Sequence, residues 1–311
     1  MIASFEPTVS KIVRNVSRVI LGKEATIRMV MAAFLSRGHV LLEDVPGVGK
    51  TVLGRALALS LGLGFKRIQF TPDLLPTDVT GLNIYDRNTG SFQFMEGPVF
   101  TDFLLADEIN RATPRTQSAL LEAMGENQIS VDGQTHPLSP FFFVLATQNP
   151  IEYEGTFTLP EAQLDRFMVR VQIGYPDPKT EQKVILDQKV SHPLSALESV
   201  VDQSEVEDLL GIPRTIVISE AVAAYIVKIV HATRSHPSLL LGASPRGSIA
   251  LMRIASVLAM MEGRDHMLPD DVKACVHSVL GHRVIQTTES KIRRETTRDI
   301  LDDVLSKTAV V

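Results

Sequence analysis

The sequence predicts an α/β fold in which helices sandwich a parallel sheet, followed by a smaller all-α domain. Three observations support this prediction. Short apolar runs alternate with helical patterns in the first half, a Gly-rich loop joins one such run to a helix, and beyond residue 178 apolar residues recur almost only at helical spacing. A length of 311 residues suits two domains, and 44% hydrophobic residues are enough for a packed core.

The N-terminal elements come first in this prediction. Apolar residues at helical spacing over 9–20 predict an amphipathic helix that ends near Gly22, and a second helix is expected over 24–36. The apolar run 39–42 predicts a buried strand, followed by a Gly/Pro turn and by a Leu- and Ala-rich helix over 52–61. Strand, loop and helix in this order form a recognised phosphate-binding arrangement.

Further strands are expected wherever a short apolar run recurs. A helix over 115–124 lies between two of these runs, and Thr113 followed by Pro114 marks its start as N-cap and first helical residue. Such alternation favours a parallel sheet with helices on both faces. The expected strands are 68–70, 103–106, 141–146 and 169–173.

Two segments depart from this alternation and predict β-hairpins. One lies near residues 78–94, with a turn at 86–90, and the other near 129–138, with Asp132-Gly133 at its turn. We therefore expect both hairpins to be insertions in the α/β domain.

Two prolines within 174–178 mark the expected domain boundary. We assign residues 1–175 to an α/β nucleotide-binding domain and residues 176–311 to a helical lid domain. The helices expected in the lid are 179–190, 219–234, 246–261 and 270–280.

Composition excludes several classes of protein. A net charge of -5 argues against a general nucleic-acid surface. Cys275 is the only cysteine, so neither an intrachain disulfide nor a thiolate metal cluster can form. Residues 1–22 lack the unbroken apolar core of a signal peptide, and no stretch approaches the length of about 18 apolar residues that a membrane span needs. We expect a cytoplasmic protein.

The loop after the first strand carries most of a phosphate-binding pattern. Its glycines let backbone N–H groups turn toward phosphates, its lysine supplies a positive charge, and its threonine hydroxyl can ligate Mg²⁺. Asp44 occupies the position where the full pattern has its first glycine. The residues expected to hold ATP are Gly47, Val48, Gly49, Lys50 and Thr51.

A phosphate loop needs an acidic group at the end of a neighbouring strand, and Asp107 and Glu108 follow the strand 103–106. We expect Asp107, with Thr51, to order Mg²⁺ and Glu108 to polarise the attacking water. The alternative is a pair of solvated acids at the end of a buried strand.

With these motifs, the chain resembles the MoxR family of AAA+ ATPases. The similarity runs from about residue 10 to residue 290, and its distinctive strings are Asp107-Glu108-Ile109-Asn110-Arg111-Ala112 and Leu159-Pro160-Glu161-Ala162-Gln163-Leu164-Asp165-Arg166-Phe167. The resemblance implies a P-loop AAA+ domain with a helical lid.

The resemblance also implies roles for residues outside the loop. Asn149 matches a sensor placed between the γ-phosphate and water, and Arg166 matches an arginine finger that reaches the nucleotide of the next subunit. Arg246 matches a second sensor in the lid, and Gly22 falls where the family contacts adenine. The alternatives are a turn at Asn149 and a surface Arg166 paired with Asp165. Arg111 competes with Arg166 for the role between subunits.

The function implied is that of an ATPase ring, expected to be hexameric, that remodels or matures a partner protein, usually one with a von Willebrand factor A domain. A second hypothesis is a DNA-acting motor. It is disfavoured because the hairpin tip 132–135 carries no Lys or Arg that could contact DNA phosphates. A third is a nucleotide-gated scaffold subunit of a larger machine, as in the metal chelatases.

Overall fold

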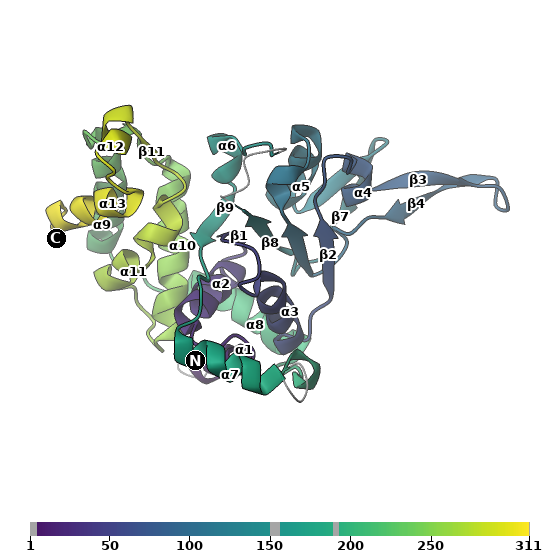
Figure 1. Cartoon of the computed structure of the whole chain (residues 1–311), viewed down its shortest axis with the longest axis horizontal. Helices are drawn as coiled ribbons and strands as arrows, with labels where there is room; N and C mark the ends of the chain where they lie inside the picture. The colour runs from purple at the N-terminus through teal and green to yellow at the C-terminus, as the bar shows by residue number, and fades with distance from the viewer. Residues whose placement is uncertain (1–4, 150–155, 189–192, 311) are drawn as a thin grey trace.

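A five-stranded parallel sheet forms the centre of the molecule (Figure 1). The computed structural model describes residues 5–149, 156–188 and 193–310. The strands pair in the order β2-β5-β8-β1-β9, and every pairing between neighbours is parallel. The predicted parallel sheet is thus confirmed. Its strands are β1 (His39–Glu43), β2 (Phe65–Gln69), β5 (Phe103–Asp107), β8 (Phe143–Gln148) and β9 (Phe167–Val171).

Both faces of this sheet are buried, because alternate side chains of each strand enter different cores. In β1, Val40 and Leu42 pack into one core, whereas Leu41 packs into the other. In β5, Leu105 packs into the first of these cores and Leu104 into the second. Strands covered on both faces appear in sequence as continuous apolar runs, and these two were predicted for that reason.

Helices cover the two faces. The first core contains apolar side chains of the first three helices and the second those of α5. Gly49 precedes α3, and Pro114 is the first residue of α5, as predicted. These helices are α1 (Glu6–Ser17), α2 (Glu24–Leu35), α3 (Lys50–Ser60), α4 (Pro76–Thr80), η2 (Ile109–Arg111), α5 (Pro114–Glu126) and α6 (Glu161–Leu164).

The two predicted hairpins are present and contact each other. They consist of β3 (Gly81–Asp86) with β4 (Ser91–Glu96) and of β6 (Gln128–Val131) with β7 (Gln134–Pro137), both antiparallel. Asn83 Nδ2 donates to Asp132 Oδ2 at 2.7 Å, and the rings of Phe94 and His136 stack at 4.0 Å. The β3–β4 hairpin extends away from the rest of the molecule (Figure 1).

The second half of the chain is helical, as predicted, with one addition. Strands β10 (Leu239–Leu241) and β11 (Ile285–Gln286) form a short antiparallel ribbon. Among the described residues, no helix is both long and apolar enough to cross a bilayer. The helices are α7 (Pro178–Gln188), η3 (Pro193–Ala196), α8 (Gln203–Gly211), η4 (Ile212–Thr215), α9 (Glu220–Ser235), α10 (Pro245–Met261), α11 (Pro269–Leu280), α12 (Thr288–Ile292) and α13 (Thr297–Lys307).

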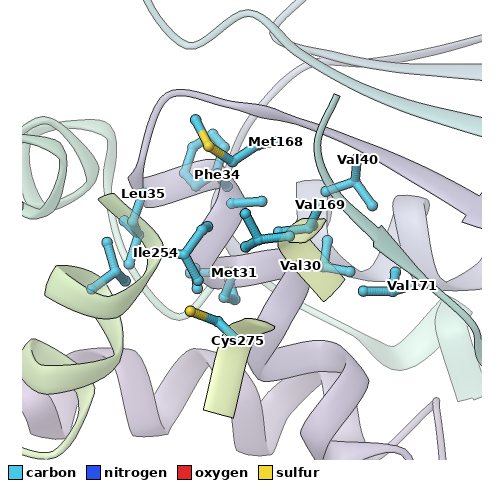
Figure 2. Packing of buried hydrophobic residues seen from close by; sticks show 14 of the residues in the cluster. Val30, Met31, Phe34, Leu35, Val40, Met168, Val169, Val171, Ile254 and Cys275 are labelled. Atoms are coloured by element: carbon cyan, nitrogen blue, oxygen red, sulfur yellow. The ribbon is translucent and has the colours of Figure 1, made fainter. Parts of the chain in front are cut away.

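One continuous core joins the two halves of the chain. Helix α2 is its middle layer: Val30 and Met31 lie among sheet residues such as Val169 and among the lid residues Ile254 and Cys275 (Figure 2). Val30, Met31 and Cys275 are fully buried. Cys275 therefore serves as a small apolar residue, and its burial raises the pKa of its thiol.

Candidate functional site

The predicted nucleotide residues gather where strands β1, β5 and β8 end. Because all three strands are parallel, their carboxyl ends lie at one edge of the sheet, and the segments that follow them meet there. The phosphate loop follows β1, Asp107 and Glu108 lie at the end of β5, and Asn149 follows β8. Sequence and topology together thus place three separate motifs in one region.

The phosphate loop turns sharply before α3. Gly47 and Gly49 have φ of 86° and 92°, a left-handed conformation that residues with a Cβ rarely adopt. Helix α3 begins at Lys50, and Lys50 Nζ donates to the backbone oxygen of Asp44 at 2.7 Å. The N-terminus of α3, the positive end of the helix dipole, therefore adjoins the loop that would hold phosphate.

The acid at the missing glycine position turns away from the loop. Asp44 Oδ2 accepts backbone N–H bonds from Ile173 at 2.7 Å and Gly174 at 2.6 Å, and Oδ1 accepts one from Val45 at 2.9 Å. Asp44 is 8% exposed. Its charge is thus met by three amides and does not oppose phosphate inside the loop.

Asp107 has both carboxylate oxygens engaged. Oδ1 accepts from the hydroxyl of Thr147 at 2.6 Å, and Oδ2 accepts from Arg67 Nη2 at 2.6 Å and Nε at 3.1 Å. The Arg67 side chain is 47% exposed, so its ion pair is partly screened by water. Asp107 is thus held from both neighbouring strands, by Thr147 of β8 and by the partly exposed Arg67 of β2.

Glu108 is held by its backbone and by its side chain. It has φ 56° and ψ 50°, and its N–H donates to Thr147 Oγ1 at 2.8 Å. Its Oε2 accepts from Gln69 Nε2 at 2.7 Å and from Arg111 Nη1 at 3.1 Å. The carboxylate is therefore restrained from two directions.

Asn149 lies beside the entrance to the phosphate loop. The neighbouring Gln148 pairs with Glu43 in the sheet, and its backbone oxygen accepts from Asp44 N–H at 3.2 Å. Asn149 is 4% exposed, and its backbone oxygen accepts from Asn110 Nδ2 at 3.5 Å. Asn149 therefore lies at the same ends of the strands as the phosphate loop, and its role as a sensor stays a prediction.

A cavity of about 240 Å³ adjoins the phosphate loop. Its walls include loop residues 47–49, the backbone 173–174 and the segment 18–21 with Lys23. Gly22, with φ 70°, lies in the chain between the wall residues Leu21 and Lys23, and Lys23 Nζ donates to the backbone oxygen of Tyr175 at 2.8 Å. The cavity beside the phosphate loop thus includes the residues on both sides of Gly22, the position expected to contact adenine.

The two candidate arginines lie at opposite ends of the strands: Arg111 at the carboxyl ends and Arg166 at the amino ends. Arg111 follows β5 and contacts Glu108 of its own chain. Arg166 precedes β9, and the next residue, Phe167, pairs with His39 at the beginning of β1. A strand of five residues spans about 17 Å, so Arg166 is that far from the edge that carries its own phosphate loop.

Arg166 does not pair with Asp165. Its Nη1 donates to the backbone oxygen of Leu121 in α5. Asp165 instead pairs with Arg283 Nε at 2.7 Å and accepts from the Ser244 hydroxyl at 3.1 Å. Burial lowers the pKa of Arg283, and the Asp165 carboxylate opposes this shift.

Arg246 lies exposed in the first turn of α10, two residues after Ser244. A cation at a helix N-terminus opposes the helix dipole, which favours an anionic partner for it. Ser244 caps the helix by accepting from Arg246 N–H at 3.2 Å, and the same hydroxyl contacts Asp165. The first turn of α10 is therefore tied to the start of β9.

Sequence reasoning missed Arg67, Gln69 and Thr147. Each contacts Asp107 or Glu108 directly. Gln69 and Thr147 stand at the carboxyl ends of strands next to β5, which is the signal that could have identified them.

The donor set suits Mg²⁺. Mg²⁺ commonly takes one or two protein oxygens, with water and substrate phosphate supplying the rest. Thr51 in the first turn of α3 and the Asp107 carboxylate provide two such oxygens at the phosphate edge. Within residues 5–149, 156–188 and 193–310, no cluster of three His, Cys, Asp or Glu side chains is arranged for a metal.

Comparisons with known proteins agree with this fold. Residues 39–169 match the model of the ATPase family associated with various cellular activities (AAA), and residues 231–304 match the AAA lid domain. YeaC of Bacillus subtilis is 48% identical over 98% of this chain and 95% of its own length. Chaperone MoxR1 of Mycobacterium tuberculosis is 39% identical over 97% of this chain and 82% of its own length. A crystal structure of a candidate ATPase from Cytophaga hutchinsonii superposes with a TM-score of 0.91 at 37% identity, covering 99% of this chain and 96% of that one.

Proposed function

Because the chain belongs to the MoxR family of AAA+ ATPases and is an ATP hydrolase, we propose that it uses ATP hydrolysis to remodel or mature a partner protein. The observation that carries the proposal is the convergence of Lys50, Asp107, Glu108 and Asn149 at one edge of the sheet, beside a cavity of about 240 Å³.

Binding of ATP would use two adjoining surfaces. Gly47, Val48, Gly49 and the N-terminus of α3 would hold the phosphates through backbone N–H groups, with Lys50 adding its charge. The cavity next to them would take adenine against the wall formed by residues 18–21 and Lys23, which flank Gly22. Arg246 would approach the phosphates from the lid.

Thr51 and Asp107 would hold Mg²⁺. The ion would neutralise charge on the β- and γ-phosphates when it is bound. Arg67 would have to leave Asp107 Oδ2 for this arrangement, since it now occupies that oxygen. Thr147 would keep Oδ1 oriented throughout.

Glu108 would activate the attacking water, and Asn149 would orient it. In the present arrangement, Gln69 and Arg111 bind the Glu108 carboxylate. Release of these contacts would therefore accompany formation of the reactive state.

The position of Arg166 supports action on a neighbouring subunit. It lies at the amino ends of the strands, whereas its own phosphate loop lies at their carboxyl ends. Arg111, in contrast, lies beside its own Glu108. We therefore assign the finger to Arg166 in a ring, taken to be hexameric, with residues 1–175 as the nucleotide-binding domain and 176–311 as the lid.

A chaperone-like role fits the relative named Chaperone MoxR1. We propose that the client complex includes a protein with a von Willebrand factor A domain. The β3–β4 hairpin supports a protein partner, because Tyr85 and Phe92 are 53% and 71% exposed on a projecting element. The neighbouring tip 132–135 carries no basic residue, which disfavours a DNA-acting motor.

Two variants test the ATPase assignment. Lys50→Ala should abolish ATP binding, whereas Glu108→Gln should retain binding and trap ATP, both measured by equilibrium binding and by phosphate release. Unchanged hydrolysis in both variants would contradict the assignment. Capture of partners with the Glu108→Gln protein, with Lys50→Ala as the matched control, tests the client. Recovery of a von Willebrand factor A protein only with the ATP-trapped form supports that partner.

A further inference from the structure

Asp44 joins two parts of the site that are far apart in sequence. Its Oδ2 accepts from Ile173 and Gly174, which lie 129 and 130 residues further along the chain. Both of those residues line the cavity beside the phosphate loop. The carboxylate thus links the beginning of the loop to a wall of the cavity.

Only a carboxylate satisfies this position fully. Three N–H groups, of Val45, Ile173 and Gly174, converge on its two oxygens at 2.6–2.9 Å. An ionised carboxylate accepts at both oxygens, whereas an amide would turn an NH₂ group toward one of these donors. Hydrogen bonds to a charged acceptor are also stronger than neutral ones.

The backbone held by Asp44 has a conformation suited to forming a wall. Gly174 has φ 66°, which turns its N–H toward Asp44 while the chain continues to Tyr175 and Pro176. Lys23, which also lines the cavity, donates to the Tyr175 oxygen at 2.8 Å. Hydrogen bonds from two residues, Asp44 and Lys23, therefore hold residues 173–175.

We propose that Asp44 is a positioning residue for the base of the nucleotide: by holding Ile173 and Gly174 against the phosphate loop, it sets the wall that contacts adenine. The proposal rests on the proposed ATP site and deepens it. We expect phosphate binding to depend less on this link, because Lys50 Nζ contacts the backbone oxygen of Asp44, which remains when the carboxylate is removed.

The test compares a ligand that has a base with one that lacks it. Binding of ATP and of inorganic tripolyphosphate, each with MgCl₂, is measured by calorimetry for the wild type, Asp44→Gly and Asp44→Asn. Asp44→Gly installs the residue usual at this loop position. We expect it to weaken ATP binding by about tenfold or more, about 1.4 kcal/mol, and to change tripolyphosphate binding by less than about twofold.

Asp44→Asn keeps the shape of the side chain and part of its accepting capacity, so its loss of ATP affinity should be intermediate. If Asp44→Gly does not fold, the comparison of ATP with tripolyphosphate is made with Asp44→Asn alone. The matched control is Asp299→Asn, which removes a carboxylate that accepts a backbone N–H of Thr296 at 2.8 Å at the start of α13. This control should leave both affinities unchanged.

The outcomes are distinct. Equal losses for ATP and tripolyphosphate would show that Asp44 acts through the phosphate loop, and no loss for ATP would show that the link is dispensable; either result overturns the proposal. A wild type that binds neither ligand would instead contradict the ATP site itself.

Discussion

Gln69 Nε2 donates a 2.7 Å hydrogen bond to Glu108 Oε2 across neighbouring strands β2 and β5. The bond holds the proposed catalytic carboxylate at the sheet edge, where Arg111 also contacts it. A glutamate engaged in this way is less available to water, so release of Gln69 is a step that nucleotide or partner could control.

Gln69→Ala should raise ATP turnover in the absence of partner. Loss of one restraint on Glu108 is expected to increase the rate by about three- to tenfold, equivalent to about 0.7–1.4 kcal/mol. The measurement is steady-state phosphate release at saturating ATP, with Gln93→Ala as a control on the β3–β4 hairpin. A fall in turnover would mean that Gln69 places Glu108 for reaction.

Arg67→Met should lower the concentration of Mg²⁺ needed by the ATP-bound protein. Arg67 Nη2 and Nε both occupy Asp107 Oδ2, the oxygen proposed to face the ion. Because Arg67 is half-exposed, the expected shift is only about two- to fivefold. The midpoint of thermal stabilisation against MgCl₂ measures it.

The control for that experiment is Arg28→Met, which breaks a surface pair with Glu262. It should leave the MgCl₂ midpoint unchanged. A higher midpoint for Arg67→Met would show that Arg67 orients Asp107 for the metal and does not compete with it.

Arg166→Ala should reduce turnover by about 10³-fold or more, as expected for loss of an arginine finger. Mixing it with Glu108→Gln protein should restore part of the activity. In a mixed ring, the Arg166→Ala subunit keeps Glu108, and its Glu108→Gln neighbour supplies Arg166. Steady-state phosphate release at varied mixing ratios measures this recovery.

The same mixing with Arg111→Ala separates the two arginines. Arg111 contacts Glu108 of its own chain at 3.1 Å, so mixing should give little recovery. Recovery with Arg111→Ala but not with Arg166→Ala would transfer the role between subunits to Arg111.

Acid should destabilise the fold through His39. Its Nδ1 accepts from Val144 N–H at 3.0 Å and its Nε2 lies 3.1 Å from the Met124 oxygen, which together fix a neutral ring. Burial lowers the pKa of His39 from 6.5 to about 4. The unfolded chain therefore binds a proton that the folded chain does not, and stability falls as pH drops below about 6.5, by about 2 kcal/mol at pH 5.

Urea unfolding at pH 8 and pH 5 measures this loss. His39→Asn keeps an acceptor for Val144 N–H but cannot titrate, so its stability should decrease less between the two pH values. Burial also lowers the pKa of His282, which leaves a residual acid dependence in the variant. An equal decrease in both proteins would rule out His39 as the source.

The fold was predictable where burial leaves a clear pattern. Strand β5 is buried along its whole length and was predicted almost to its ends. Strand β2 lies at an edge, and only Ile68 in it is buried, so the sequence predicted 68–70 where the strand covers Phe65–Gln69. Helix α8 was not predicted, because only three of its nine residues are buried and apolar.

The site was predictable where the chemistry is local. The phosphate loop and the Asp107-Glu108 pair are contiguous strings, so their residue types and positions identified them. The partners of Asp44 and the pairing of Asp165 with Arg283 depend on strand order and on the docking of the lid. A pattern of apolar residues shows which face of a helix or strand is buried, but not which element packs against that face. It therefore could not predict either set of contacts.

The apolar layer formed by α2 limits how the two halves of the chain can be separated. Val30 and Met31 are covered on one side by the sheet and on the other by α10 and α11. A truncated chain that ends near residue 175 would leave this layer open to water and prone to aggregation. We therefore expect the nucleotide-binding half to be insoluble by itself, and the intact chain to melt in a single calorimetric transition.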